Sequence, residues 1–254
     1  MQLRQVTDDL GTTLSLGTVT RVVSLVPSLT ESIAVSAPEL LVGATDWCTH
    51  PADLDVTRIR GTKNPNVAQI VGLEPDLVVC NQEENRQVDV QRLRAAGCAV
   101  WVTRIETLDE AFDSLRRLFT AALDRPIPSW LTEAEAVWSH PEPQTRLRAV
   151  VPIWRDPWMV VGRDTFTGDL LSRLGIDNAC ADQPGRYPQL SLEQLTALRP
   201  ELVVLPDEPY LFTPEDGPDA FPGLACALVS GRSLTWYGPS LASARPSLLA
   251  QLHR

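Results

Sequence analysis

The chain has 254 residues, 44% of them hydrophobic, and carries 32 acidic against 22 basic side chains, which gives a formal net charge of −10. This length is enough for one large or two small hydrophobic cores. An acidic surface repels phosphate backbones, so we expect no nucleic-acid partner.

Neither a membrane span nor a signal peptide is expected. No apolar run approaches the ~20 residues that cross a bilayer. Residues 1–17 contain two adjacent aspartates and no apolar stretch of the signal-peptide kind. These features predict a cytoplasmic protein without membrane insertion. The five cysteines lack CxxC spacing, which favours free and mostly buried thiols.

Residues 1–124 predict one lobe of alternating strands and helices. Ser28-x-x-Glu31 and Thr107-x-x-Glu110 match the capping-box pattern that starts a helix. Asn66 is expected to cap another helix, and Gly97 to end one in the left-handed conformation. The pattern predicts a hairpin over 2–19, strands at 21–26, 41–45, 77–80 and 99–103, and helices beginning near 28, 66, 87 and 107.

Residues 125–145 predict a linker. The prolines of Arg125-Pro-Ile-Pro128 interrupt the chain, a short helix is expected over 129–138, and His140-Pro-Glu-Pro143 ends the segment. Residues 146–254 then predict a second lobe. Its expected elements are strands at 149–154 and 202–205, helices at 168–174, 191–198 and 240–252, and an acidic, proline-rich loop at 206–222.

The chain repeats itself across these two lobes. Residues 66–85 align without a gap on residues 191–210, an offset of 125, and seven of the twenty positions are identical. Each copy predicts a polar cap, a short amphipathic helix, a proline, a buried strand and a loop with a glutamate. The repeat therefore predicts two similar α/β domains with parallel sheets. Ligands are expected where their strand-end loops face each other.

Several motifs carry a family resemblance. The first lobe contains Ser24-Leu-Val-Pro-Ser28, Asn64-Pro-Asn66 and Leu73-x-Pro75-Asp-Leu-Val78, and the second contains Gln194-Leu and Pro200-Glu-Leu-Val-Val204. In this order they resemble the class III periplasmic binding proteins, or helical backbone metal receptors. These include vitamin B12, siderophore and haem receptors of uptake ABC transporters. The resemblance implies two Rossmann-like lobes joined by a single linker helix, with cobalamin or another metal chelate held in the inter-lobe cleft.

The resemblance also bears on a transporter partner. Docking in this family uses a glutamate near the start of the corresponding helix in each lobe. Glu193 occupies that place in the second lobe, whereas Ala68 occupies it in the first. Because one acidic anchor is missing, transporter docking is doubtful. The chain resembles a leaderless branch of the superfamily. A substrate-binding component of an ABC transporter remains an alternative.

Large aromatic rings lie at or near the predicted strand-end loops. Such rings form walls that suit a flat macrocycle, although some of them could equally pack the lobes. Trp236 is the first choice for a ligand contact, because its segment resembles a segment of the B12 receptor. The candidate rings are those of Trp47, Trp154, Trp158, Tyr187, Tyr210 and Trp236.

Two further groups are candidates for polar chemistry. Cys48 and His50 are two residues apart, so an extended segment would place their side chains on the same side. A thiolate and an imidazole there could both bind a metal ion. His50 could instead cap a turn. Glu83 and Glu208 are equivalent in the repeat. Carboxylates that converge would need to be neutralised by Lys63, Arg155 or Arg163, or by a bound cation.

We therefore expect a cytoplasmic binding protein for a corrinoid or another metal chelate. An enzyme that processes or loads such a ligand with a carboxylate pair is the alternative, but no GxSxG, P-loop or GxGxxG motif is present. The predicted ligand-binding residues are Ser28, Trp47, Cys48, His50, Lys63, Asn64, Glu83, Glu84, Asn85, Trp154, Arg155, Trp158, Arg163, Tyr187, Glu208, Tyr210, Trp236 and Tyr237.

Overall fold

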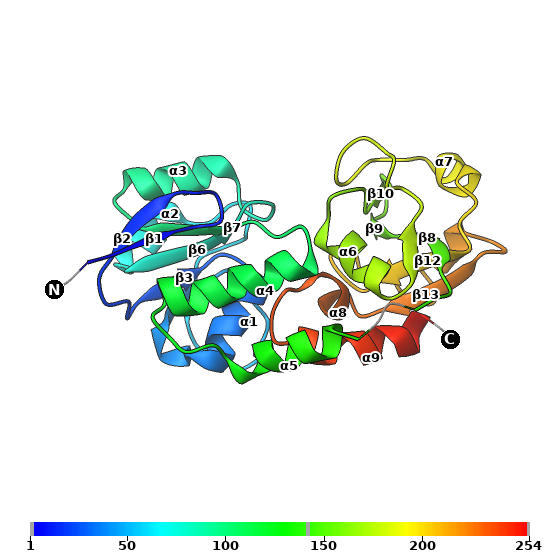
Figure 1. Ribbon diagram of the computed structural model, residues 1–254. Coiled ribbons are helices and arrows are strands. Elements are labelled where there is room, and N and C mark those ends of the chain that lie inside the picture. Colours follow the sequence, from blue (N-terminus) through cyan, green and yellow to red (C-terminus); the bar gives the residue numbers. More distant parts are fainter. Residues whose placement is uncertain (1–2, 141–142, 253–254) are drawn as a thin grey trace. The chain divides into compact units, whose positions relative to one another are not determined.

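The computed structural model describes residues 3–140 and 143–252, and the chain divides into two compact units (Figure 1). The N-terminal unit comprises the described residues up to Ile105 together with 109–132 and 237–239. The C-terminal unit comprises residues 106–108, 133–236 and the described residues from Ser240 onward. The division thus falls inside a helix, after Thr132. The sequence-based boundaries at 124/125 and 145/146 stay a prediction, and residues 141–142 of that linker lie outside the described residues.

The N-terminal unit is built on a five-stranded parallel sheet in the order β5-β4-β3-β6-β7. The central strands β3 and β6 are mostly apolar and are buried along their length, as expected of a parallel sheet covered by helices. The strands are β3 (Val22–Ser24), β4 (Leu41–Ala44), β5 (Thr57–Arg58), β6 (Leu77–Asn81) and β7 (Val100–Thr103).

Helices connect these strands. They are α1 (Pro27–Ser36), the 3₁₀ turn η1 (Pro38–Leu40), α2 (Val67–Gly72), α3 (Gln87–Ala95), α4 (Leu108–Arg117) with its π-helical end η2 (Leu118–Ala122), and the first part of α5 (Ser129–Trp138). Asn66 caps α2 as predicted, its side chain accepting from the Gln69 amide at 3.2 Å. The capping box predicted at Ser28 is wrong, because Pro27 already starts the helix and Val26 is its cap residue.

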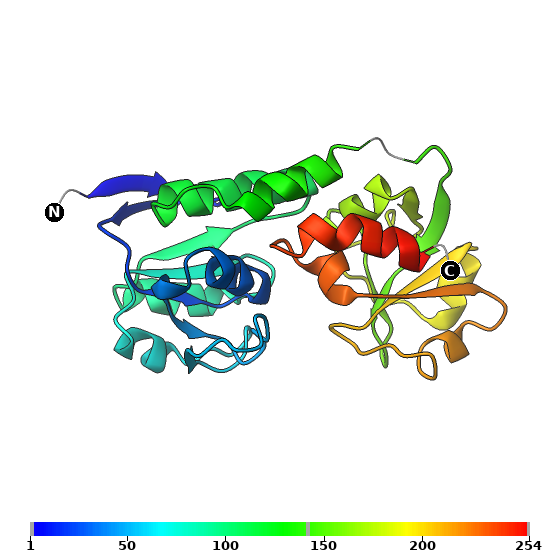
Figure 2. The ribbon, with the colours of Figure 1, turned by 90° about the horizontal axis from the view of Figure 1, so that it is seen from below.

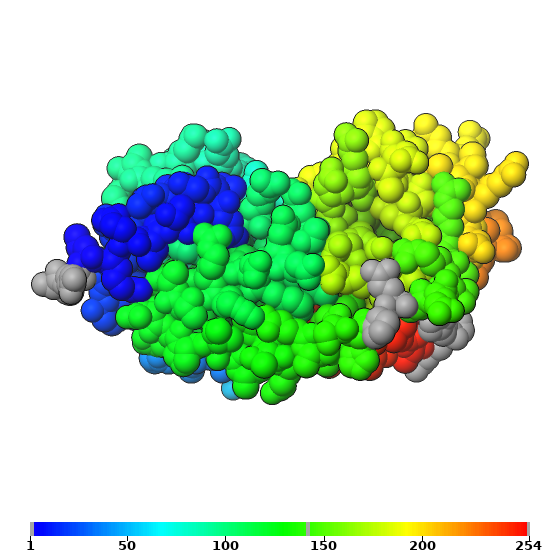
Figure 3. All heavy atoms as spheres, viewed as in Figure 1, coloured from blue at the N-terminus to red at the C-terminus, as the bar shows by residue number. Residues whose placement is uncertain are grey.

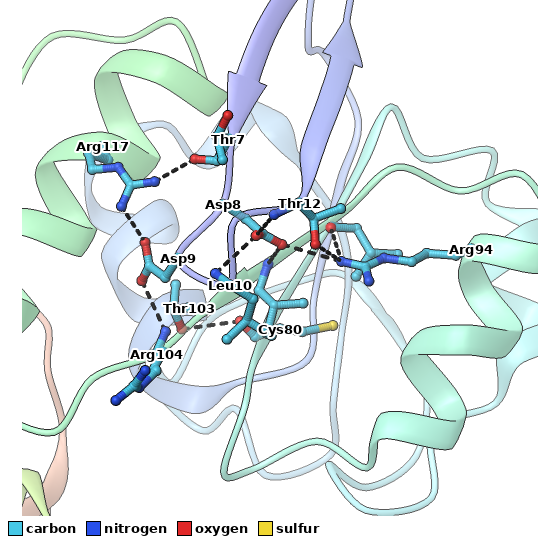
Figure 4. Close-up of polar contacts among 12 residues, drawn as sticks. Thr7, Asp8, Asp9, Leu10, Thr12, Cys80, Arg94, Thr103, Arg104 and Arg117 are labelled. Carbon is cyan, nitrogen blue, oxygen red and sulfur yellow. Dashed lines mark hydrogen bonds and ion pairs between the residues drawn. The ribbon is translucent and has the colours of Figure 1, made fainter.

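The predicted N-terminal hairpin is confirmed as β1 (Arg4–Thr7) paired antiparallel with β2 (Thr13–Leu16). Figure 3 shows it in blue on the surface of its unit. Its turn is fastened to the edge strand β7 by two aspartates (Figure 4). Asp8 accepts from Thr12 at 2.7 Å and from the Val102 amide at 3.3 Å, while Asp9 accepts from the Arg104 amide at 3.0 Å. The turn therefore covers an edge that would otherwise expose hydrogen-bonding groups.

The C-terminal unit contains a four-stranded parallel sheet in the order β11-β8-β12-β13. Its strands are β8 (Leu147–Val150), β11 (Ile176–Asn178), β12 (Leu202–Pro206) and β13 (Ala225–Val229). The single strand predicted over 149–154 is in fact β8 followed by β9 (Pro152–Trp154), which pairs antiparallel with β10 (Met159–Val160). Pro152 lacks the amide hydrogen needed to continue the first strand, so the chain changes sheets there.

Four helices and a short 3₁₀ turn, η3 (Pro218–Ala220), complete the described part of this unit, together with the end of α5. Ser191 and Gln194 form a reciprocal capping box on α7, and Thr165 caps α6. Figures 1 and 2 show α9 beside α8. The helices are α6 (Phe166–Arg173), α7 (Leu192–Ala197), α8 (Gly231–Thr235) and α9 (Leu241–Leu252). None of the described helices is long and apolar enough to span a membrane.

The sequence repeat is a repeat of structure, with α2 and β6 in one unit matching α7 and β12 in the other. The residues before the two repeated prolines, Glu74 and Arg199, both adopt a positive φ, of 48° and 52°. The equivalent acids then fasten the neighbouring strand: Asp76 accepts from the Arg21 amide, and Glu201 from the Arg148 amide, each at 2.9 Å. The two units are therefore versions of one α/β design with parallel sheets, as the fold-class prediction states.

Candidate functional site

In each unit the repeated strand ends in a polar loop at the carboxyl edge of the sheet. These loops are residues 81–85 after β6 and residues 207–211 after β12. In open parallel sheets this edge is where ligands are bound.

In the N-terminal unit, the loop 81–85 and the turn 61–64 are fastened together. The Asn85 side chain donates to the Leu25 carbonyl at 3.2 Å and to the Thr62 carbonyl at 3.1 Å. Lys63 Nζ donates to the Glu83 carbonyl. Asn85 is buried, and these bonds fix the backbone that carries Lys63 and Glu83; its predicted ligand contact stays a prediction.

Trp47 is the exposed aromatic ring at this edge, with 66% of its surface accessible. It packs against Gly61, where an added Cβ would lie 3.1 Å from the indole nitrogen and 2.5 Å from Asn64 Oδ1. A side chain at position 61 would therefore push Trp47 or Asn64 away. The predicted residues Trp47, Lys63 and Asn64 are thus gathered around one turn.

Cys48 and His50 differ in their surroundings, and their role as metal ligands stays a prediction. Cys48 is fully buried, with its sulfur 3.0 Å from Thr30 Oγ1 and 3.1 Å from Thr45 Oγ1, whereas His50 is exposed. Burial raises the pKa of the Cys48 thiol, against the opposing effect of these hydroxyls. Among the described residues, no group of three or more His, Cys, Asp and Glu side chains could hold a metal ion.

Tyr237 belongs to the N-terminal unit although it comes from the end of the sequence. Its hydroxyl donates to Glu84 Oε1 at 3.1 Å, and burial, together with the charge of Glu84, holds the pKa of this phenol well above its ordinary value. The next residue, Gly238, lies so close to α1 that a Cβ would be 2.9 Å from the Ser28 carbonyl oxygen. Ser28 is itself buried. Both Ser28 and Tyr237 therefore lie beneath the surface of this edge.

In the C-terminal unit, Glu208 packs closely against Gly231. A Cβ at Gly231 would lie 2.3 Å from Glu208 Cγ, and the Gly231 amide donates to Asp207 Oδ1 at 2.6 Å. Burial raises the pKa of Glu208, as does the charge of Asp207, while the Trp236 indole and Arg232 act in the opposite direction. One carboxylate oxygen of Glu208 is buried without a hydrogen-bond partner in the described structure.

Trp236 is 8% exposed, and its indole N–H is bonded to Glu208. Its assignment as a wall for the ligand stays a prediction. The exposed ring at this edge is Trp154, which is 43% accessible and meets Tyr210 edge to face at 5.7 Å. Trp158 is buried and stacks on Phe212. Tyr187 is exposed on a separate loop.

Arg155 contacts this aromatic group and pairs with two nearby carboxylates. Its guanidinium pairs with Asp216 and Asp219 and lies 5.5 Å from the centre of the Trp158 ring, while the Tyr210 hydroxyl donates to Asp216 at 2.6 Å. The prediction that Arg155 neutralises Glu83 or Glu208 is therefore wrong.

The other two predicted counter-ions are also placed elsewhere. Arg163 lies 3.8 Å from Asp164, lining a hollow of about 400 Å³ at the start of α6. Lys63 contacts the Glu83 carbonyl rather than its carboxylate.

Sequence reasoning missed three of these contributors: Gly231, Asp216 and Asp219. Gly231 follows β13, a strand whose Ala225–Val229 sequence was not recognised, so its place beside Glu208 had no signal. Asp216 and Asp219 lie in the acidic loop at 206–222, where the sequence offered Arg155 several possible carboxylate partners.

The chain is similar to known proteins in sequence and in structure. No protein-family model matches the chain. The chain is 25% identical to a vitamin B12-binding protein of Pectobacterium carotovorum over 74% of this chain and 72% of that protein. It is 26% identical to an uncharacterized ABC transporter substrate-binding lipoprotein of Bacillus subtilis over 74% of this chain and 63% of that one.

Solved structures share the fold. The periplasmic vitamin B12-binding protein BtuF of Vibrio cholerae superposes with a TM-score of 0.77 at 20% identity, over 93% of this chain and 97% of that one. A periplasmic heme-binding protein, BhuT, superposes with a TM-score of 0.75 at 20% identity, over 91% and 97%. With its two α/β units, the chain therefore shares the fold of these periplasmic binding proteins and is similar in sequence to vitamin B12-binding proteins, in line with the resemblance to the class III periplasmic binding proteins.

Proposed function

We propose that this protein binds a metal chelate, a corrinoid before any other, through the strand-end loops of its units. The observation that carries the proposal is Trp47, a large ring left 66% exposed on a tightly built turn at the carboxyl edge of a sheet. An exposed indole there offers a flat apolar face to a macrocycle. The names of the relatives support the ligand class, since they bind vitamin B12 or heme.

The direct test is a visible-range titration of the purified protein with cyanocobalamin and, separately, with hemin. Each ligand absorbs where the protein does not. Saturable binding at one equivalent, with the ligand recovered unchanged after release, is the expected result. Recovery of a chemically altered chelate would favour the enzymatic alternative, and the absence of binding to either chelate would contradict the proposal.

A role as the substrate-binding component of an ABC transporter is the second candidate. The name of the Bacillus subtilis relative supports it and counts against the doubt raised by the sequence. Glu193 lies exposed in the first turn of α7, whereas α2 has no acid in its first turn and presents Ala68. We infer a partner that engages one acidic anchor. Co-purification with a B12-type transporter in detergent, abolished by Glu193→Ala, is the expected result; a complex that ignores this change would contradict the one-anchor interpretation.

A cytoplasmic location is a further proposal. All five cysteines are free thiols in the described structure, which suits a reducing compartment. Fractionation of the native host tests it: recovery with the soluble cytoplasmic fraction is expected, and recovery with the periplasmic or membrane fraction would contradict it.

A further inference from the structure

Lys63 is the only lysine in the sequence, and the other 21 basic residues are all arginines. Its side chain lies on the turn 61–64, next to the loop that carries Glu83 and Glu84. Lysine and arginine differ chemically: the ammonium is a compact point charge with three rotatable donors, and the guanidinium is a planar fork. A position that keeps lysine in a chain otherwise built with arginine is therefore informative.

Elsewhere in the described chain, arginine makes the structural contacts of a cation. It caps backbone carbonyls, as Arg4 does for Ala121 at 2.7 Å, Arg21 for Leu73 at 2.7 Å and Arg148 for Leu198 at 2.9 Å. It also makes the ion pairs of both units. Capping the Glu83 carbonyl would thus be an ordinary task for arginine, and this contact does not by itself explain Lys63.

The surroundings of Lys63 leave its ammonium available. The side chain is exposed, and its hydrogen bond in the described structure is the one to the Glu83 carbonyl. No carboxylate of the described residues lies within ion-pair distance of Nζ, and an ammonium has three donors. Two N–H groups therefore remain for other acceptors. Trp47 packs on the same turn, against Gly61, so an exposed aromatic face and a held ammonium belong to one small surface.

We propose that the Lys63 ammonium binds an anionic oxygen on the rim of the chelate whose flat face lies on Trp47. The proposal rests on the proposed chelate-binding function and adds the chemical group recognised. A phosphodiester, as in the nucleotide loop of cobalamin, and a carboxylate, as in the propionates of haem, both provide such an oxygen. The Glu83 carbonyl orients the ammonium, and the two remaining donors contact the anion.

The single lysine makes a labelling experiment unusually clean. Reductive methylation with ¹³C-formaldehyde modifies Lys63 and the N-terminal amine, which serves as an internal control in the same NMR spectrum. With saturating cyanocobalamin or hemin, we expect the labelling of Lys63 to slow at least tenfold while that of the terminal amine is unchanged. Equal rates with and without a bound chelate would overturn the role of Lys63.

Affinity measurements on variants identify the anion. Lys63→Gln should weaken the binding of the recognised chelate roughly tenfold to a hundredfold, as expected for the loss of a charge-assisted contact. Lys63→Arg should recover part of it. Arg60→Gln is the matched control, because it removes the same charge from an exposed side chain three residues away, and it should change affinity less than threefold.

Comparison of four ligands distinguishes a phosphodiester from a carboxylate as the recognised group. If the phosphodiester is recognised, Lys63→Gln weakens cyanocobalamin but not cobinamide, which lacks the nucleotide loop. If carboxylates are recognised, it weakens hemin but not its dimethyl ester. A merely structural role would weaken all four ligands alike and would overturn the proposal, as would equal effects of Lys63→Gln and Arg60→Gln. In those cases the chelate-binding function stands, whereas failure of the unaltered protein to bind any of the four would overturn both.

Discussion

Gly231→Ala tests whether the backbone at the start of α8 positions the Glu208 loop. The new methyl group would lie 2.3 Å from Glu208 Cγ, 2.8 Å from the Glu208 carbonyl oxygen and 2.9 Å from its amide nitrogen. Two of these three atoms belong to the backbone, so rotation of a side chain cannot relieve the clash. Either α8 or the loop at 207–211 must move.

The expected cost follows from this crowding. Overpacking of a fixed site costs about 1–3 kcal/mol, which exceeds the ~0.5–1 kcal/mol that alanine gains over glycine in a helix. The net loss should lower the melting temperature by roughly 2–4 °C per kcal/mol in a chain of this size. The displaced loop should also weaken chelate binding.

Differential scanning calorimetry on Gly231→Ala and on Gly72→Ala provides the assay. Gly72 is the last residue of α2, and a Cβ there would meet nothing within 4 Å, so this matched change should be neutral or slightly stabilising. Equal melting temperatures for the two variants would refute the reasoning, because the contact with Glu208 would then carry no cost.

Further predictions concern anchoring and pH. Asp8 is 2% exposed and accepts from Leu10, Thr12 and Val102, so Asp8→Ala should cost about 3 kcal/mol in urea unfolding by leaving buried donors unpaired. Asp8→Asn should cost less, the exposed Asp113→Ala should lie within about 0.5 kcal/mol of the parent, and equal stability of Asp8→Ala and Asp113→Ala would contradict the anchor. The pKa of Tyr237 is raised by burial and by Glu84, so its contribution to stability is complete below the unfolded value near 10 and decreases as the pH rises above it. Tyr237→Phe should flatten this alkaline loss, and an unchanged slope in unfolding measured between pH 9 and 11 would contradict the burial of the phenol. The pKa of Asp76 is lowered, because hydrogen bonds from Thr20 and Arg21 outweigh the effect of its burial. The stability that Asp76 contributes is present above its unfolded pKa and is lost as the pH falls below that value. Asp76→Asn should therefore reduce the loss of unfolding free energy in acid. An acid dependence equal to that of the parent would contradict this role of Asp76.

Periodicity and turn chemistry predicted most elements of the fold. The helix at 129–138 has the predicted bounds because Pro128 directly precedes it and no proline interrupts it. The repeat identified α2–β6 and α7–β12 because cap, proline and apolar run recur in one order. Local sequence signals failed to predict elements whose secondary structure depends on tertiary contacts. β13 was missed because Ala225 and Cys226 are weak strand signals and only pairing with β12 fixes them.

The candidate site was less predictable than the fold. Its location at strand ends followed from the alternation of strands and helices, and Trp47 is exposed there. The partners of charged side chains did not follow, since sequence gives no distances. Arg155 is held by Asp216 and Asp219 rather than by a glutamate of the repeat. The burial of Cys48 against Thr30 and Thr45, next to an exposed His50, did not follow from their spacing either.

Isothermal titration of the unaltered protein and of Trp47→Ala with cyanocobalamin and with hemin tests the central claim most directly. We expect saturable one-to-one binding of one of these chelates and a loss of roughly tenfold or more in affinity for Trp47→Ala, since burying an aromatic contact contributes ~1.5–3 kcal/mol. Circular dichroism should show an intact fold in the variant, because Trp47 is exposed. Absence of binding to both chelates, or an affinity unchanged by the loss of the Trp47 ring, would contradict it.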